Sequence, residues 1–243
     1  MQFDWTFLKM SHSDPLIKAF KGGTMERASP SRSLSNVLES RSRVSMVSLV
    51  SYLRNSKDLF ILKEPIIAFA GQTLSTLLVS RNKEIHNNME IAVSADTETT
   101  KWYMSNVLRA MKINFNIKTS EYIEAEDLLN EADYALVIGD EALRVFSSKL
   151  TIILDIGYEF MRIFQMFPLY AVSVYRDGKP DIAEEWVSNA DKYKDLAAKE
   201  LASRLDISQV LARRYYGNVR YQRDESIGNT LSFVGKSVMA NST

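Results

Sequence analysis

The sequence predicts an α/β protein built of two lobes with a ligand cleft between them. Strand-like and helix-like segments alternate along most of the chain, which is typical of a mainly parallel sheet covered by helices on both faces. The alternation falls into two blocks, because the chain leaves the first block near Leu77 and returns near Tyr170. We therefore expect a discontinuous first lobe, residues 1–76 and 170–243, and a second lobe, residues 77–169.

The elements of the first block follow from apolar spacing and from start and stop signals. Pro15 suits the first turn of a helix, and Leu34, Val37 and Leu38 form one apolar helix face. Gly71 interrupts a long apolar stretch, which indicates two extended segments joined by a bend. The expected strands are residues 3–10 and 44–50 and two segments within 65–80; the expected helices are residues 14–20 and 31–40.

The second block and the tail follow the same rules. Trp102, Val107, Leu108 and Met111 form the apolar stripe of one helix. The expected strands are residues 91–95, 115–118, 134–138 and 150–154, and the expected helices are residues 97–111 and 125–132. Residues 168–175 lead back to the first lobe. The tail is expected to be helical from Ile182 to Leu201, over residues 207–216 and over residues 227–239.

The composition narrows the classes of function. The 243 residues contain 30 Lys and Arg and 30 Asp and Glu, so no charge excess indicates a nucleic acid or an anionic membrane as partner. The absence of cysteine excludes thiolate metal sites, and two histidines are too few for a multi-histidine metal centre. No segment approaches the roughly 20 apolar residues that span a bilayer, and the start lacks an export signal. We expect a cytoplasmic protein.

The most informative segment is a buried strand that ends in Gly-Asp. Five apolar residues from Tyr134 to Ile138 precede Gly139 and Asp140, and a helix-favouring stretch follows. In open α/β sheets, ligands bind at the carboxyl ends of strands, which would place Asp140 at a binding site. Gly139 allows a sharp turn or a close approach of a ligand. The alternative is that Asp140 is only a helix N-cap.

Three further strand ends carry polar side chains. His12 follows the first strand and could act as an acid, as a base or as a hydrogen-bond donor to a bound anion. It could equally be a partly exposed loop residue. Ser48 could hold a polar ligand or have no function. Ser75 follows the glycine bend, but no Gly-x-Ser-x-Gly elbow surrounds it, so we do not expect a serine-hydrolase nucleophile.

One more strand end is a hydroxyl-rich turn that contains Thr97, Thr99 and Thr100 at the start of a predicted helix. Unpaired backbone N–H groups and the positive end of the helix dipole favour a carboxylate or phosphate there. Ordinary helix capping would use the same residues. No glycine-rich phosphate loop occurs, which argues against a nucleotide ligand.

With these residues in place, the chain resembles the menaquinone-biosynthesis family that contains chorismate dehydratase and dihydroxynaphthoate synthase of the futalosine pathway. The resemblance rests mainly on Val-Ile-Gly-Asp-Glu-Ala-Leu at 137–143, Leu-Asp-Ile-Gly-Tyr-Glu-Phe at 154–160 and Phe-Pro-Leu-Tyr-Ala-Val at 167–172. Weaker similarity covers residues 31–52, 71–80 and 97–100. The first segment is similar to the dehydratase branch, because the synthase branch usually carries a His-Glu pair there.

The resemblance implies a type II periplasmic-binding-protein fold and a chorismate dehydratase that forms 3-[(1-carboxyvinyl)oxy]benzoate without metal or organic cofactor. It implies His12 and Ser75 as catalytic residues, since the family's active-site serine is retained as Ser75. The small carboxylate substrate would be bound by Ser48, Thr97, Thr99, Thr100 and Asp140. A homodimer is compatible with the sequence. The alternatives are a non-catalytic carboxylate-binding protein of the same fold and a dihydroxynaphthoate synthase.

The chain departs from the dehydratase pattern at several positions. His12 stands where the dehydratases carry an asparagine. Gln165-Met166 replaces the usual Thr-Gly, and Phe160 and Ser173 stand where tryptophans are usual. The resemblance therefore supports the fold more strongly than it supports the activity.

Overall fold

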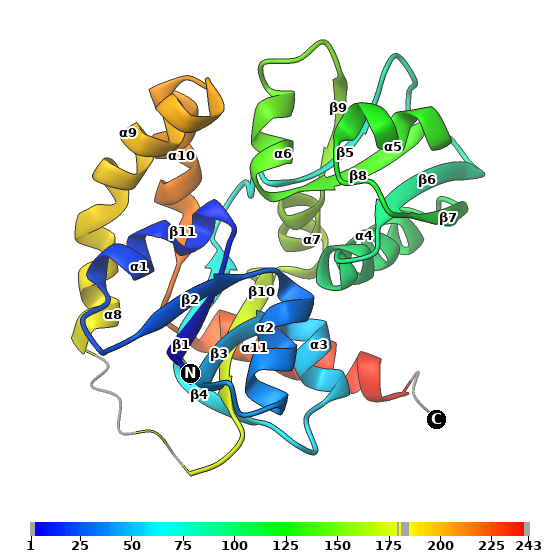
Figure 1. Cartoon of the computed structure of the whole chain (residues 1–243). Coiled ribbons are helices and arrows are strands. Elements are labelled where there is room, and N and C mark those ends of the chain that lie inside the picture. Colours follow the sequence, from blue (N-terminus) through cyan, green and yellow to red (C-terminus); the bar gives the residue numbers. More distant parts are fainter. Residues whose placement is uncertain (1–2, 179, 181–184, 241–243) are drawn as a thin grey trace. The chain divides into compact units, whose positions relative to one another are not determined.

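The computed structural model describes residues 3–178, 180 and 185–240, and it confirms the α/β fold class (Figure 1). The chain divides into two compact units, each with its own sheet. Unit 1 comprises Met1–Ala68, Pro168–Ala197 and Val219–Thr243, and unit 2 comprises Phe69–Phe167 and Ala198–Asn218. The predicted lobes placed residues 69–76 and 198–218 in the first lobe, whereas both group with unit 2 here.

Contacts between segments far apart in the sequence explain this grouping. The Asn218 carbonyl accepts a hydrogen bond from the Ala70 N–H at 2.9 Å, and Asn218 Nδ2 donates to the Gln72 carbonyl at 2.8 Å. The rings of Phe69 and Tyr215 lie 5.7 Å apart. Helix periodicity alone could not assign residues 198–218 to a unit, because it does not specify the partner of the apolar face.

The sheet of unit 1 is mixed rather than mainly parallel. Strand β1 pairs in parallel with β2 and β3, and β10 pairs antiparallel with β3 and β4. In spatial order, the strands are β11 (Val219–Arg220), β4 (Phe60–Phe69), β10 (Leu169–Tyr175), β3 (Ser42–Ser48), β1 (Phe3–Leu8) and β2 (Met25–Ala28). The return strand β10 is therefore the one that runs against its neighbours.

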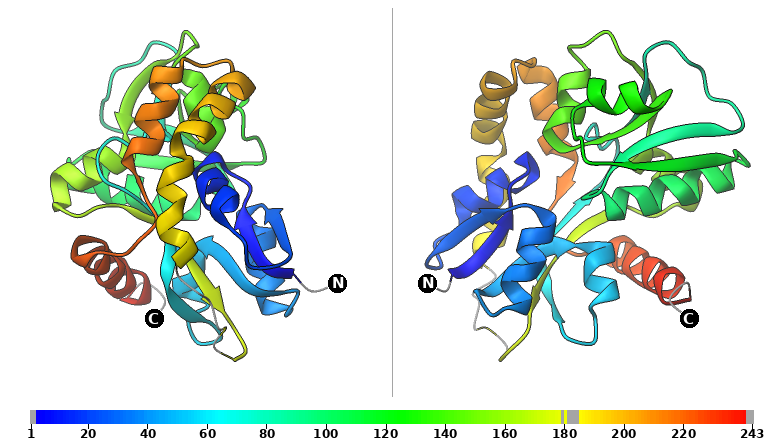
Figure 2. Two further views of the ribbon diagram at one scale, coloured as in Figure 1. Left: turned by 90° about the vertical axis from the view of Figure 1, so that its left-hand side faces the viewer. Right: turned by 45° about the vertical axis from the view of Figure 1, so that its right-hand side comes forward.

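Helices pack on the sheet of unit 1 and supply its core. Helix α2 contacts β1 and β3, while α3 and α11 contact β10 and lie beside each other (Figure 2). Helix α1 packs against α8 and the 3₁₀ turn η2. Their bounds are α1 Asp14–Ala19, α2 Pro30–Leu38, α3 Leu49–Arg54, α8 Glu185–Asn189, η2 Ala190–Tyr193 and α11 Glu225–Ala240; a further 3₁₀ turn, η1, spans Ser11–Ser13.

Several elements of unit 1 differ from the sequence expectation, among them β3 and β2. Residues 44–50 were expected to be one strand, but β3 ends at Ser48 and α3 begins at Leu49. The short strand β2 was not expected, because Met-Glu-Arg-Ala lacks a β-forming pattern. Its parallel pairing with β1 is a tertiary contact, with Trp5 opposite Met25.

The sheet of unit 2 is also mixed. Strands β6, β7 and β8 pair in parallel, and β5 runs antiparallel to both of its neighbours, β8 and β9. In spatial order, the strands are β7 (Phe115–Ser120), β6 (Met89–Ser94), β8 (Tyr134–Ile138), β5 (Thr76–Ser80) and β9 (Thr151–Asp155).

Helices cover both faces of this second sheet. Helices α5 and α6 pack on one face through a cluster that includes Leu128, Ala135 and Val137, and α4 and α7 pack together on the other (Figure 1). Helix α7 was not expected from the sequence, although Asp155 caps its start by accepting from the Tyr158 N–H. The bounds are α4 Glu98–Ala110, α5 Ala125–Glu131, α6 Gly139–Val145, α7 Ile156–Phe164, α9 Lys194–Leu205 and α10 Gln209–Asn218.

The expected start of the tail helix at Ile182 lies outside the described residues. Within the described part of the chain, no helix has both the length and the apolar character needed to cross a bilayer.

Candidate functional site

Sheet topology brings five of the seven predicted site residues to one edge of the unit 2 sheet, with Thr99 and Thr100 close behind Thr97. Strand β5 starts where β8 and β9 end, since Thr76 pairs with Ile138 and Leu77 pairs with Asp155. Strand β6 is parallel to β8, so its carboxyl end lies at the same edge. Ser75 precedes β5, Asp140 follows β8, and Thr97 follows β6. This edge, where β6, β8 and β9 end, is called the unit 2 edge below.

Thr97 is the most unusual residue at the unit 2 edge. It occupies the N-cap position of α4, but its side chain makes no capping hydrogen bond. Thr97 is 2% exposed, and its Oγ1 has no hydrogen-bond partner among the described residues. A buried hydroxyl without a partner costs about 1–3 kcal/mol. The capping explanation for Thr97 is therefore wrong, and its hydroxyl is available to a ligand.

Thr99 and Thr100 belong to the first turn of α4 and are both buried. The first backbone N–H groups of an α-helix have no partner within the helix. The dipole of α4 adds a positive potential at this end. Hydroxyl and backbone donors thus meet where a carboxylate would be stabilised.

Ser75 and Asp140 flank the same backbone contact. The Gly139 N–H donates to the Ser75 carbonyl at 2.8 Å, and Gly139 has a φ of 62°, a conformation that favours glycine. Ile138, rather than Asp140, is the N-cap of α6, so the N-cap alternative for Asp140 is wrong. Asp140 lies in the first turn of α6, is half-buried, and pairs with Arg204 at 3.5 Å.

Asp155 is a residue of this edge that the sequence analysis did not select. Its carboxylate accepts hydrogen bonds from Thr73 Oγ1 at 2.6 Å, the Leu74 N–H at 2.8 Å and the Tyr158 N–H at 3.1 Å. Burial raises the pKa of Asp155, although these hydrogen bonds act to lower it. The motif Leu-Asp-Ile-Gly-Tyr at 154–158 was the available signal.

The contacts of Asp155 hold the loop that carries Ser75. Leu74 has a φ of 58°, which is uncommon for a residue with a side chain, and its N–H bonds to Asp155. Ser75 follows directly and is 4% exposed. Asp155 therefore acts as a positioning residue for Ser75.

A cavity of about 300 Å³ lies beside this loop in unit 2. Its lining includes Gln72, Leu74, Asp155, Tyr158 and Arg214. The Arg214 guanidinium donates to the Gln72 side-chain oxygen. A carboxylate and a guanidinium thus line one small cavity at the unit 2 edge.

The other two predicted residues, His12 and Ser48, belong to unit 1. Strands β1 and β3 are parallel neighbours, so the residues that follow them lie at one edge of their sheet. His12 lies in the η1 turn, is 7% exposed, and its carbonyl accepts from the Tyr221 hydroxyl at 3.0 Å. The alternative that His12 is a partly exposed loop residue is therefore wrong.

Ser48 acts as the N-cap of α3. Its Oγ accepts from the Ser51 N–H at 3.4 Å and lies 2.6 Å from the Ser51 hydroxyl oxygen. These contacts give Ser48 a structural role.

A metal centre finds no support among the described residues. No group of three or more His, Asp or Glu side chains there is arranged to hold a metal ion. The polar groups of the unit 2 edge are hydroxyl, carboxylate, guanidinium and backbone groups, a set that suits an organic anion.

Solved structures resemble nearly the whole chain. Protein AF1704 from Archaeoglobus fulgidus is 14% identical with a TM-score of 0.71, covering 98% of this chain and 97% of that one. The periplasmic aliphatic sulphonate binding protein SsuA from Escherichia coli is 10% identical, with a TM-score of 0.66 and coverage of 99% and 87%. The CA3427 gene product of Candida albicans, described as having the generic periplasmic binding protein fold, is 12% identical, with a TM-score of 0.66 and coverage of 99% and 90%. These likenesses show that the chain has the periplasmic-binding-protein fold.

The sequence comparisons concern the family. A search among curated proteins finds no match. The profile of a family described as menaquinone biosynthesis matches residues 8–227. Because this match covers nearly the whole chain, the protein belongs to the menaquinone biosynthesis family.

Proposed function

We propose that the protein is a cytoplasmic chorismate dehydratase of menaquinone biosynthesis. The family match over residues 8–227 supports the pathway. The observation that supports a carboxylate ligand is the buried Thr97 hydroxyl, which lies at the start of α4 and has no partner among the described residues. A substrate carboxylate at this position would accept from that hydroxyl and from backbone N–H groups of the first helical turn.

The predicted residues divide by chemical role. Thr97, Thr99 and Thr100 bind a carboxylate of the substrate, whereas Ser48, expected from the sequence to assist, caps α3 instead. Asp140 orients the ligand, and Arg204, at 3.5 Å from Asp140, orients Asp140 in turn.

The reaction is the loss of one water molecule from chorismate. The proton leaves the ring carbon that bears the enolpyruvyl ether, the hydroxyl leaves the neighbouring carbon, and the ring becomes aromatic. We assign the leaving proton and hydroxyl to Ser75 at the unit 2 edge, and the resemblance to the dehydratases extends this role to His12. Aromatisation supplies much of the driving force, so the protein chiefly orients the substrate and stabilises developing charge. The reaction requires no metal or organic cofactor.

Incubation of the purified protein with chorismate tests this function. We expect 3-[(1-carboxyvinyl)oxy]benzoate to accumulate with enzyme concentration, measured by liquid chromatography and aromatic absorbance. The Ser75→Ala variant is the control for contaminating activity, because it lacks one proposed catalytic hydroxyl, and thermal unfolding checks that it is folded. Absence of product from active, folded protein would contradict the dehydratase proposal.

A non-catalytic carboxylate-binding protein is the second candidate. Two observations favour it: the fold is shared with binding proteins such as SsuA, and His12 replaces the asparagine usual in the dehydratases. This candidate predicts saturable binding of chorismate, measured by calorimetry, without any product. Binding together with turnover would exclude it.

A further inference from the structure

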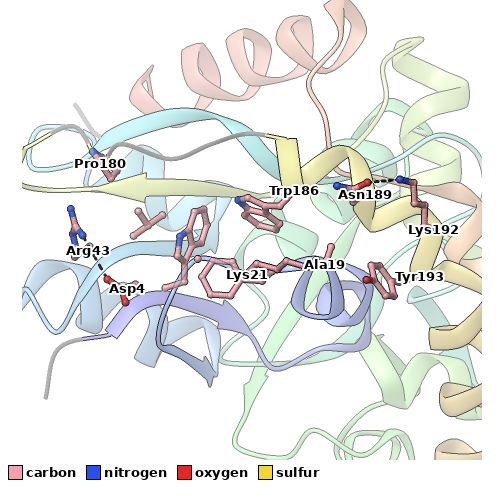
Figure 3. Close-up of a pocket in the computed structure, with 13 residues that line it drawn as sticks. Asp4, Ala19, Lys21, Arg43, Pro180, Trp186, Asn189, Lys192 and Tyr193 are labelled. Carbon is pink, nitrogen blue, oxygen red and sulfur yellow. Dashed lines mark hydrogen bonds and ion pairs between the residues drawn. The ribbon is translucent and has the colours of Figure 1, made fainter.

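A cavity in unit 1 is lined by none of the residues assigned to the proposed function. It measures about 630 Å³, and residues of β1, β3, α8, η2 and the segment after α1 line it (Figure 3). Asp4 and Trp5 lie near the start of β1, and Arg43 and Val44 near the start of β3. Ser48 ends β3, about 13 Å farther along the strand from Val44 at 3.3 Å per residue. The cavity therefore lies at the amino ends of these parallel strands, opposite His12 and Ser48.

Three aromatic rings form the apolar wall of this cavity. The Trp5 and Trp186 rings lie 5.5 Å apart at 86°, and the Phe20 and Trp186 rings lie 5.3 Å apart at 77°. Trp5 is 3% exposed and forms the buried floor, while Trp186 is only half-buried. The Trp5 ring also stacks on Phe7 with centroids 5.3 Å apart, so the half-buried Phe20 and Trp186 rings offer most of the aromatic surface to a further planar group.

The polar lining carries an excess of positive charge. Lys21, Arg43 and Lys192 line the cavity together with one carboxylate, Asp4. Figure 3 shows Arg43 and Asp4 at one end of the cavity and Lys192 at the other. The Lys192 ammonium donates to Asn189 Oδ1 at 2.6 Å, which orients this cation.

The carboxylate of Asp4 is already engaged. Its Oδ2 accepts from the Thr24 N–H at 2.9 Å and from the Thr24 hydroxyl at 3.0 Å, and its Oδ1 lies 3.7 Å from Arg43. Asp4 thus offsets Arg43, and the part of the lining that the structure describes contains no further acidic side chain to offset Lys21 and Lys192. Anions are therefore favoured in the cavity over cations.

We propose that this cavity is a second binding site, specific for a small planar aromatic carboxylate. The aromatic ring of the ligand packs against Trp5, Phe20 and Trp186, and its carboxylate meets Lys21 and Lys192. The cavity volume lies within the range of about 300–1,000 Å³ typical of small-molecule sites, and an apolar lining with few polar groups is also typical of them. The proposal is independent of the dehydratase reaction, because it uses none of the residues assigned to that reaction.

Binding of 1-naphthoate tests the proposal in the full chain. The Trp102→Phe background leaves Trp5 and Trp186 as the remaining tryptophans of the three, and both line the cavity. We expect saturable quenching of their fluorescence by 1-naphthoate, confirmed by calorimetry. The neutral analogue 1-naphthalenemethanol should bind at least tenfold more weakly, because it lacks the charge that the lysines recognise.

Two variants locate the bound probe. Lys21→Gln with Lys192→Gln should weaken 1-naphthoate binding at least tenfold, and Trp186→Leu should also weaken it. The matched control Lys199→Gln removes an exposed lysine of α9 outside the cavity lining and should bind like the parent. Thr97→Val should not change this binding either.

The proposal is overturned if 1-naphthoate does not bind, or if the double lysine variant binds it as tightly as the parent. Loss of binding in Thr97→Val alone would place the probe at the unit 2 edge and would also overturn it. Thermal unfolding of each variant shows whether it is folded. If Trp186→Leu does not fold, the double substitution of the exposed Lys21 and Lys192 still tests the site.

Discussion

Ser48 and Thr97 occupy the same kind of position but use their hydroxyls differently. Each follows a strand and occupies the N-cap position of the next helix. Ser48 accepts from the Ser51 N–H and caps α3, whereas the Thr97 side chain makes no cap bond and its Oγ1 has no partner among the described residues. Ser48 thus stabilises unit 1, and Thr97 leaves an unused donor at the unit 2 edge.

This difference shows what a hydroxyl at a helix start does and does not indicate. Serine and threonine are common N-caps, so their presence predicts a helix boundary well. It does not indicate a ligand site unless the hydroxyl is buried and unbonded, because only then does the protein lose stability that a ligand could restore.

The largest expected effect comes from removing the hydroxyls proposed to bind the carboxylate. Thr97→Val with Thr100→Val should weaken chorismate binding by about 1–3 kcal/mol, because the carboxylate loses two donors. Calorimetric titration measures this change, with the exposed Thr119→Val as matched control. Thr97→Val alone should leave the free energy of unfolding unchanged or raise it, since the methyl group replaces an unsatisfied hydroxyl. Unchanged affinity together with lower stability would show that Thr97 is structural after all.

Ser75 tests whether the unit 2 edge also carries chemistry. Ser75→Ala should lower kcat for chorismate dehydration at least tenfold, about 1.4 kcal/mol in the barrier, if its hydroxyl contacts the reacting groups. Steady-state kinetics measures kcat, and KM should change less than kcat. An unchanged kcat would remove Ser75 from the catalytic residues.

Ser48→Ala should lower the free energy of unfolding by about 1 kcal/mol, the usual cost of a lost N-cap. Ser29, the N-cap of α2, offers a matched comparison because its side chain also accepts from a backbone N–H, that of Arg32. The exposed Ser203→Ala, within α9, should have little effect. Urea unfolding measures all three. A loss at Ser203 as large as that at Ser48 would contradict the capping role.

The smallest expected effect is a pH dependence of stability at Asp155. Burial raises its pKa in the folded protein above the ordinary 3.8, so the folded state binds this proton more tightly than the unfolded chain. Its contribution to stability is therefore greatest below pH 3.8 and falls as the pH rises through the raised pKa.

Asp155→Asn should remove this fall. The free energy of unfolding of the parent minus that of Asp155→Asn should decrease as the pH rises through this window, measured by urea unfolding at several pH values. Asp96→Asn, at an exposed position, is the matched control. A difference that instead increases with pH would show that the folded protein favours the carboxylate.

Some of the candidate site was predictable from the sequence, and Asp155 shows why some was not. The strand of residues 134–138 and the turn at Gly139 have strong local signals, a continuous apolar run and a glycine. Asp155 lies in a segment whose strand was also predicted from the sequence. Its positioning role, however, depends on hydrogen bonds from Thr73 and Leu74, some 80 residues earlier. Side-chain contacts over such separations have no local signature in one sequence.

The sequence by itself determined the α/β class, the glycine bend between β4 and β5, and the polar residues that end the strands. These features depend on local periodicity and backbone preference, which act over a few residues. Only the tertiary structure decided that β5 and β10 run against their neighbours, that residues 198–218 group with unit 2, and that Ser48 caps a helix while Thr97 does not. Strand direction and the satisfaction of a buried hydroxyl depend on partners distant in the chain, and local patterns do not identify those partners.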